Sequence, residues 1–290
     1  MTTLARDERL VLPDGRTLAY QEVGAPDGRP VLQFHGWPGS RLLALHQADA
    51  ADALGVRLIC PDRPGVGASD DHRGRTLLDW PADVTALADH LGLDRFAVIG
   101  VSGGGPYALA CAHRLAPRVH RLGLVSAMGP TQERGASRHV ALPTRAMLGL
   151  AQRVPDLFRY PVALFGLGIL RAPDLLFAQL RLSLSAVDRA LLDRPEVNAA
   201  LRAESQEAFR RGASGLARDS VIYGGPWGFD LADVTVPTVL WHGTDDRNVP
   251  VAMGHHLAAS LPRCEARILP GSGHFFYYER PREILEAVVS

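Results

Sequence analysis

Short apolar runs alternate with longer amphipathic stretches along most of this chain. The runs are bounded by turn residues, as is typical of buried strands, whereas the longer stretches repeat apolar residues at helical spacing. The pattern predicts strands at residues 10–12, 17–24, 31–34, 57–60, 96–99, 122–125, 238–241 and 266–269. Predicted helices follow most of them, at residues 42–54, 77–91, 106–115, 251–261 and 281–289. Because strands and helices alternate, we expect a parallel sheet covered by helices, opened by a hairpin around Asp14-Gly15.

One long segment breaks this alternation. Between Ser126 and Thr238 there is no strand signal over about a hundred residues, which is too long for a simple crossover. The segment predicts several amphipathic helices, interrupted by Pro143, Pro155, Pro161, Pro173 and Pro195. We therefore expect a sheet domain made of residues 1–128 and 229–290, with a helical cap inserted at residues 129–228.

Composition and charge narrow the class of protein. The 290 residues are 47% hydrophobic, and 31 basic residues balance 31 acidic ones. A net charge of zero gives no electrostatic basis for binding nucleic acid or an anionic membrane surface. The first residues have no apolar signal region, and no run of 18 apolar residues occurs, so we expect a cytoplasmic protein. Its cysteines fit neither a disulfide framework nor a zinc site and are predicted to be buried thiols: Cys60, Cys111 and Cys264.

The strand predicted at residues 96–99 leads directly into a Gly-x-Ser-x-Gly motif, Gly100-Val-Ser102-Gly-Gly104. A small-residue helix follows it. This context is that of a nucleophile elbow, in which a serine on a tight turn presents its hydroxyl above the sheet. The flanking glycines let strand and helix pass close to each other. Ser102 is therefore the candidate nucleophile.

A serine nucleophile needs a base and a group that orients the base. His274 lies in a glycine-rich turn after the last predicted strand, which places its imidazole at the carboxyl edge of the sheet. Asp245 and Asp246 follow the preceding strand, and one of them can accept the second imidazole N–H. The resulting order along the chain is serine, aspartate, histidine, as in one class of hydrolases.

An acyl-transfer site also needs hydrogen-bond donors for the oxyanion. Residues 34–40 follow an early core strand, and we expect the backbone N–H groups of Trp37 and Gly103 to serve as these donors. His35 is a weaker candidate base than His274, because the adjacent Gly36 indicates a structural turn.

Other motifs do not indicate a cofactor or a metal. Residues 62–70 are rich in glycine, but they lack the Gly-Lys-Ser/Thr ending of a phosphate loop. His255 and His256 are adjacent rather than at the spacing of metal ligands on a helix. We therefore expect neither a cofactor nor a metal.

Taken together, these motifs resemble the α/β-hydrolase superfamily, in particular serine hydrolases with a helical cap. The resemblance covers about two thirds of the chain and rests on H-G-W-P-G, D-R-P-G-V-G-A-S-D, G-V-S-G-G-G-P, G-T-D-D-R-N-V-P and G-S-G-H, in family order. It implies a mostly parallel eight-stranded sheet flanked by helices, with an inserted helical cap. In the family pattern the acid lies three residues after the glycine that ends its strand, and counting from Gly243 selects Asp246. A serine at position 102 argues against epoxide hydrolases and haloalkane dehalogenases, which use an aspartate.

The expected function is therefore hydrolysis of a carboxylic ester through an acyl-enzyme. Leu and Phe residues between 157 and 184 predict a small-molecule substrate with an apolar group. Two alternatives with related chemistry are a carbon–carbon bond hydrolase and an aminopeptidase resembling proline iminopeptidases, although Trp37 stands where the latter would have glycine. From another class, the chain could be a ligand receptor, or a perhydrolase-like or biosynthetic enzyme on the same scaffold.

Overall fold

The computed structural model describes residues 4–132 and 142–290, and its centre is one eight-stranded sheet. The strand order is β1-β2-β4-β3-β5-β6-β7-β8. The strands are β1 Leu4–Val11, β2 Thr17–Gly24, β3 Arg29–Phe34, β4 Val56–Pro61, β5 Phe96–Val101, β6 Val119–Val125, β7 Thr238–Gly243 and β8 Cys264–Leu269. Only β2 is antiparallel to its neighbours, β1 and β4, whereas β4-β3-β5-β6-β7-β8 pair in parallel. The expected mostly parallel sheet is confirmed, and the loops after β3, β5, β7 and β8 leave it at the same edge.

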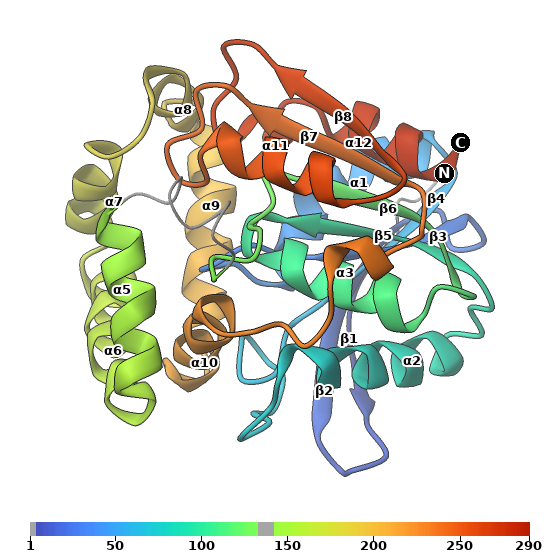
Figure 1. The fold of residues 1–290 in the computed structure, drawn as a ribbon, viewed down its shortest axis with the longest axis horizontal. Helices are drawn as coiled ribbons and strands as arrows, with labels where there is room; N and C mark the ends of the chain where they lie inside the picture. Colours follow the sequence, from blue (N-terminus) through green and yellow to red (C-terminus); the bar gives the residue numbers. More distant parts are fainter. Residues whose placement is uncertain (1–3, 133–141) are drawn as a thin grey trace.

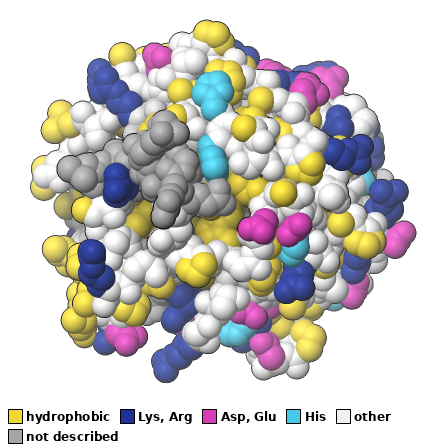
Figure 2. Space-filling view, in the orientation of Figure 1, with side chains coloured by type: hydrophobic (Ala, Val, Ile, Leu, Met, Phe, Trp, Pro, Cys, Tyr) yellow, Lys and Arg dark blue, Asp and Glu magenta, His cyan; other side chains and the backbone are white. Residues whose placement is uncertain are grey.

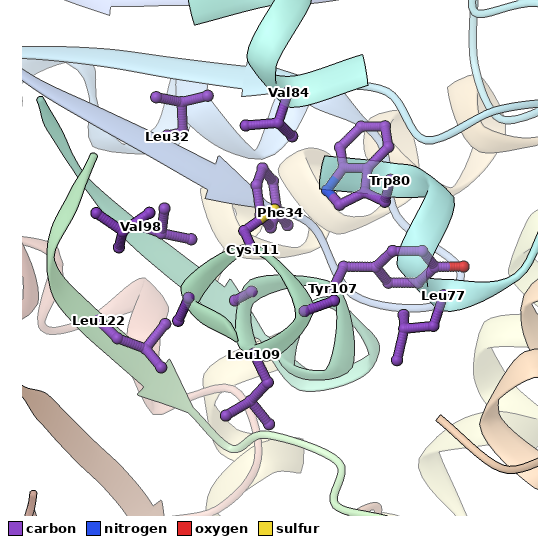
Figure 3. Packing of buried hydrophobic residues seen from close by; sticks show 14 of the residues in the cluster. Leu32, Phe34, Leu77, Trp80, Val84, Val98, Tyr107, Leu109, Cys111 and Leu122 are labelled. Carbon is purple, nitrogen blue, oxygen red and sulfur yellow. The ribbon is translucent and has the colours of Figure 1, made fainter. Parts of the chain in front are cut away.

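One face of the sheet is covered by α2 (Trp80–His90), α3 (Gly105–Arg114) and α11 (Val251–Ser260). Figure 3 shows how Trp80 and Val84 of α2 and Tyr107 of α3 pack around Phe34 of β3. The rings of Phe34 and Trp80 meet edge to face, with centroids 5.3 Å apart. This packing holds α3, the helix that follows Ser102, against the sheet.

The opposite face is covered by α1 (Ala48–Ala53) and α12 (Pro281–Val289). Successive strand residues point to opposite faces, so Val239 packs in this layer and Leu240 in the other. Since both faces are buried, the inner strands are almost continuously apolar, which is why their pattern could be recognised in the sequence.

Several helices differ in detail from the predicted ones. The helix expected over residues 42–54 is a 3₁₀ helix, η1 Arg41–Gln47, followed by the short α1. The one expected over 77–91 begins as η2 Leu77–Asp79 and continues as α2, while η5 Phe276–Tyr278 follows β8 without having been predicted. The strand expected over residues 10–12 starts earlier, at Leu4. Because this edge strand is largely exposed, its first residues are charged and lack the alternation of apolar and polar residues that predicts a strand.

Helices α5 to α10 gather on one side of the sheet domain, as Figure 1 shows in yellow-green to gold. They are α5 Leu142–Arg153, α6 Pro155–Arg171, α7 Pro173–Arg181, α8 Ala186–Leu192, α9 Pro195–Ala208 and α10 Ser214–Gly224. The expected helical insertion is confirmed, while its boundaries at residues 129 and 228 stay a prediction. Residues 133–141 of the expected cap lie outside the described residues.

The outer surface carries both signs of charge. Figure 2 shows basic and acidic side chains interspersed on one face, without a field of a single sign. Several leucines of the cap are exposed, among them Leu157, Leu164 and Leu182. Within the described residues no single helix is long and apolar enough to span a membrane. Among the described helices, only α6 and α7 taken together meet those criteria of length and composition, and they are bent by 113°.

Candidate active site

Ser102 lies at the junction between β5 and α3. Its φ is +52°, in the left-handed region that residues other than glycine rarely adopt, so the turn is strained. A Cβ on Gly104 would lie 2.1 Å from the carbonyl oxygen of Phe34, so α3 can approach β3 this closely only because residue 104 is glycine. Ser102 lines a cavity at this edge of the sheet.

The imidazole of His274 stands beside this serine. His274 follows β8, and its Nε2 is 3.1 Å from Oγ of Ser102. Its Nδ1 is 2.7 Å from Oδ2 of Asp246, which follows β7. The structure therefore brings three of the predicted site residues, separated by up to 172 positions in the sequence, into one hydrogen-bonded chain.

Of the two neighbouring aspartates, Asp246 is the one that contacts His274. Its other oxygen, Oδ1, accepts hydrogen bonds from the backbone N–H groups of Asn248 and Val249, both at 2.8 Å. Asp245 is exposed and accepts a hydrogen bond from the hydroxyl of Thr244. The hydrogen bonds to Oδ1 thus fix the Asp246 carboxylate, and its Oδ2 faces the imidazole.

Opposing effects act on the pKa of His274. Burial of the imidazole works against protonation, but the charge and hydrogen bond of Asp246, together with the charge of Asp188, outweigh it and raise the pKa of His274 above its ordinary value. A carboxylate that accepts Nδ1–H leaves the lone pair of Nε2 facing Ser102. This is the tautomer that a general base for Ser102 requires.

A second histidine, His242 of β7, lies next to Asp246. Its Nε2 is 2.7 Å from the carbonyl oxygen of Val249 and 3.5 Å from Oδ2 of Asp246. Burial lowers the pKa of His242, so the ring is neutral at neutral pH and Nε2–H donates to the Val249 carbonyl. No motif in the sequence marks His242, because it lies inside an apolar strand.

The loop after β3 meets the Ser102 turn. A Cβ on Gly36 would lie 3.3 Å from Cβ of Ser102, and one on Gly103 would lie 3.3 Å from Cβ of Trp37. The two predicted oxyanion donors, Trp37 and Gly103, therefore come from adjacent segments. His35 is fully buried, and its ring nitrogens contact the carbonyl of Gly36 and the N–H of Arg63.

The buried guanidinium of Arg63 fixes the orientation of the Gly36–Trp37 peptide. It donates to the carbonyls of His35 and Gly36, the latter at 3.0 Å, and pairs with Asp219 of α10 at 2.9 Å. In a trans peptide the C=O and the following N–H point in opposite directions. Because the Gly36 carbonyl points at Arg63, the N–H of Trp37 points away from it.

Asp188, at the start of α8, holds the histidine loop from the cap side. Its two carboxylate oxygens accept the backbone N–H groups of His274 and Phe275, both at 3.0 Å. The hydroxyl of Ser185 donates to the same carboxylate at 2.7 Å. In the sequence, Ser185 and Asp188 have the spacing of a helix-capping box, which predicts a helix start but not this contact.

The cavity next to Ser102 has a volume of about 480 Å³ and lies between the sheet edge and the cap. Its wall is largely apolar, with cap residues that include Phe165, Ile169, Phe177, Leu180 and Leu184. The indole of Trp37 stacks on Phe165, with ring centroids 5.8 Å apart. Some apolar residues of the stretch 157–184 thus line the cavity, whereas others are exposed on the outer surface of the cap.

Another cavity, of about 600 Å³, is lined by Asp71, Arg75, Asp156 and Arg218, among others, and contains none of the predicted site residues. Its position away from Ser102 makes the apolar cavity the candidate substrate site, although the polar one is larger. Across residues 4–132 and 142–290, no group of three or more His, Cys, Asp or Glu side chains is arranged to hold a metal ion.

Comparison with known proteins identifies the family. Residues 29–281 match the model of the alpha/beta hydrolase fold. The chain belongs to the alpha/beta hydrolase fold family. The resemblance inferred from the sequence motifs is therefore confirmed, and the catalytic roles of individual residues in this α/β hydrolase stay predictions.

Several known proteins are similar over nearly the whole length. The chain is 30% identical to a non-heme haloperoxidase of Rhodococcus erythropolis over 277 residues, which cover 90% of each chain. It is 27% identical to a 2-hydroxy-6-oxo-2,4-heptadienoate hydrolase of Pseudomonas putida, over 97% of this chain and 94% of the relative. The structure of an esterase from Exiguobacterium antarcticum is similar with a TM-score of 0.72 at 18% identity, over 98% of each chain, and shows the shared fold.

Proposed function

We propose that this α/β hydrolase is a cofactor-independent serine hydrolase that cleaves a carboxylic ester through an acyl-enzyme. The observation that carries the proposal is the chain from Ser102 Oγ to His274 Nε2 at 3.1 Å and from His274 Nδ1 to Asp246 at 2.7 Å. A nucleophile, a base and an orienting carboxylate in this arrangement have the geometry that acyl transfer requires.

In the first half-reaction, Oγ of Ser102 attacks the carbonyl carbon while its proton passes to Nε2 of His274. The N–H groups of Trp37 and Gly103 donate hydrogen bonds to the oxyanion, as Arg63 orients the Gly36–Trp37 peptide for this role. The tetrahedral intermediate then collapses. The alcohol leaves with the proton from His274, and the acyl group remains on Ser102.

In the second half-reaction, water attacks the acyl-enzyme and gives its proton to His274. Collapse of the second tetrahedral intermediate releases the carboxylic acid, and the proton returns to Ser102. The apolar wall formed by Phe165, Ile169 and Phe177 favours a substrate with an apolar group, because burial of such a group in the cavity is favourable.

Labelling with a fluorophosphonate tests the activated serine, and a panel of p-nitrophenyl esters of increasing acyl length tests the reaction. We expect wild-type protein to be labelled and Ser102→Ala protein not to be labelled. Labelling with ester turnover supports the proposal. A wild-type protein that is neither labelled nor active on any ester would instead favour a ligand receptor on the hydrolase scaffold.

A second candidate reaction is favoured by the relative named as a non-heme haloperoxidase. If hydrogen peroxide replaces water in the second half-reaction, attack on the acyl-enzyme yields a peroxy acid and free Ser102. A peroxy acid can oxidise bromide without a haem group. Turnover of an ester with peroxide and bromide, followed by bromination of an added acceptor, would identify this activity. Bromination that persists in Ser102→Ala protein would exclude it.

The relative from Pseudomonas putida motivates one further assay. Incubation with 2-hydroxy-6-oxo-2,4-heptadienoate, the compound in that relative's name, tests cleavage of a carbon–carbon bond. Consumption of this compound at a rate well above that of all esters would replace ester hydrolysis as the assigned reaction.

A further inference from the structure

A carboxyl group lies in the wall of the largely apolar cavity. Glu204, on α9, lines the cavity with Leu201 and Ser205 of the same helix, and only 4% of its surface is exposed. Its Oε1 accepts a hydrogen bond from the hydroxyl of Tyr278 at 2.7 Å. Among the described residues, no Arg or His forms an ion pair with it. Glu207, one turn further along α9, pairs with Arg41 at 2.6 Å.

The surroundings of Glu204 keep its carboxyl neutral. Burial raises the pKa of Glu204 to about 8, and the hydrogen bond from Tyr278 offsets only part of this effect. The titratable groups that face it are the hydroxyls of Tyr277 and Tyr278 and the thiol of Cys60, all of them neutral at neutral pH.

The helix η1 packs against α9 and brings two basic side chains to this region, and both have other partners. Arg41 binds Asp7, Asp62 and Glu207, whereas His46 contacts the backbone carbonyl of Tyr278 through Nε2. Arg247 and His274 line the same cavity from the loops after β7 and β8, but neither contributes to the pKa of Glu204. No ion pair therefore compensates a negative charge on Glu204 in the described part of the chain.

A protonated carboxyl has one donor and one good acceptor. With the Tyr278 hydroxyl as the donor to Oε1, that oxygen is the carbonyl of the neutral acid, and Oε2 carries the proton. Because Glu204 lines the cavity, an oxygen of a ligand bound there can accept the hydrogen bond of this proton. A neutral acid of this kind matches an oxygen acceptor and does not match an ammonium group, which would need a carboxylate.

We propose that Glu204 is a specificity-determining residue that donates a hydrogen bond to a neutral ketone or ether oxygen of the substrate. This inference rests on the proposed function, because it takes the cavity beside Ser102 as the substrate site. It narrows the substrate class from apolar esters to esters that also carry an uncharged oxygen away from the scissile bond.

The test compares esters that differ only in such an oxygen. In an acyl series, p-nitrophenyl hexanoate is compared with its 4-oxo and 5-oxo derivatives. In an alcohol series, hexyl acetate is compared with its 4-oxo and 5-oxo derivatives. The measured quantity is the ratio of kcat/KM for each oxo ester to that of its parent. We expect at least one ratio of about 3 to 10 in wild-type protein, which corresponds to the net contribution of a hydrogen bond between neutral groups.

Variants at position 204 separate recognition from packing. Glu204→Leu has no donor, so the preferred oxo ester should lose its advantage. Glu204→Gln keeps an acceptor for Tyr278 and an N–H donor for the substrate, so it should retain the preference. Glu196→Gln, at an exposed position of the same helix, is the matched control and should keep the wild-type ratio.

The pH dependence of the ratio gives a readout that packing alone would not change. The wild-type preference should fall as the pH rises through about 8, because an ionised Glu204 can no longer donate. In Glu204→Gln the ratio should stay constant over the same range. A wild-type ratio that is unaffected both by this pH change and by Glu204→Leu overturns the proposal.

A binding measurement keeps this test separate from the proposed function. Calorimetric titration of the same esters into Ser102→Ala protein gives the ratio of affinities without turnover. A ratio that depends on Glu204, in a protein whose wild type hydrolyses no ester, would support the subsite and overturn the hydrolase. Ester turnover with ratios independent of Glu204 would keep the hydrolase and overturn the subsite.

Discussion

The buried carboxyl of Glu204 makes the stability of the protein depend on pH, and Glu204→Gln should remove that dependence. Burial raises the pKa of Glu204 from its ordinary 4.5 to about 8. Between these pH values the folded protein holds a proton that the unfolded chain has released, so the free energy of unfolding falls as the pH rises through this window. A gap of about 3.5 pH units corresponds to about 5 kcal/mol, at about 1.4 kcal/mol per unit.

This figure is an upper bound, because water that enters the cavity would stabilise the carboxylate. We therefore expect a loss of about 2 to 5 kcal/mol in wild-type protein that is absent from Glu204→Gln. The substitution keeps the shape of the side chain and an oxygen that accepts the Tyr278 hydroxyl. Glu204→Gln therefore removes the titratable carboxyl and keeps the packing around residue 204.

Urea denaturation of wild-type and Glu204→Gln protein at about pH 5 and about pH 8.5 gives the change in unfolding free energy between the two pH values for each protein. The effect of Glu204 is the difference between these two changes. Glu196→Gln, on the exposed side of α9, is the control and should follow the wild type. A difference below about 1 kcal/mol between wild type and Glu204→Gln would show that Glu204 is ionised or solvated in the folded protein.

Three further predictions concern the catalytic groups. Ser102→Ala should lower ester turnover by about 10⁴- to 10⁶-fold with an unchanged circular dichroism spectrum, and retention of a tenth of the activity would refute its role. Asp246→Asn should cost up to about 10⁴-fold in kcat, because it favours the wrong imidazole tautomer, whereas Asp245→Asn should cost little. Rates in the reverse order would assign the orienting role to Asp245. Asp188→Asn removes a charge that raises the pKa of His274, so the acidic limb of the kcat/KM profile should move to lower pH, and an unmoved limb would contradict this.

The fold could be predicted from the sequence in those segments where burial on both faces makes the residues apolar. The strands β3, β5, β6 and β7 are largely buried on both faces, so each contains a short run of mostly apolar residues. The Ser102 turn was visible because its glycines are required by the close approach of β5, α3 and β3. By contrast, the first residues of β1 are charged and exposed, and no local pattern distinguishes them from a loop.

Groups that depend on distant partners could not be predicted. Asp188 is 86 residues from His274, and Glu204 is 74 residues from Tyr278. A single acidic residue on an amphipathic helix usually faces solvent, so nothing in the sequence marks these two as buried. The alternation of cavity-lining and exposed residues in α6 and α7 likewise follows from how the cap packs on the sheet domain. The position of each cap helix must therefore be known before its cavity-lining and buried polar residues can be identified.

The cap contributes to the geometry of the site as well as to the cavity wall. Asp188 of α8 holds the backbone of His274, and Asp219 of α10 holds Arg63, which orients the peptide before Trp37. Both side chains of the Arg63–Asp219 pair are completely buried, and Asp219 also pairs with the buried Arg75 at 2.6 Å. Separation of α10 from the sheet domain would leave these charges uncompensated, at a cost of about 3 to 5 kcal/mol for a buried charge that loses its partner. We therefore expect α8 and α10 to stay docked on the sheet domain during turnover. Any movement of the cap that accompanies substrate entry would then involve α5, α6 and α7, whose residues line the cavity and bear no such buried ion pair among those described.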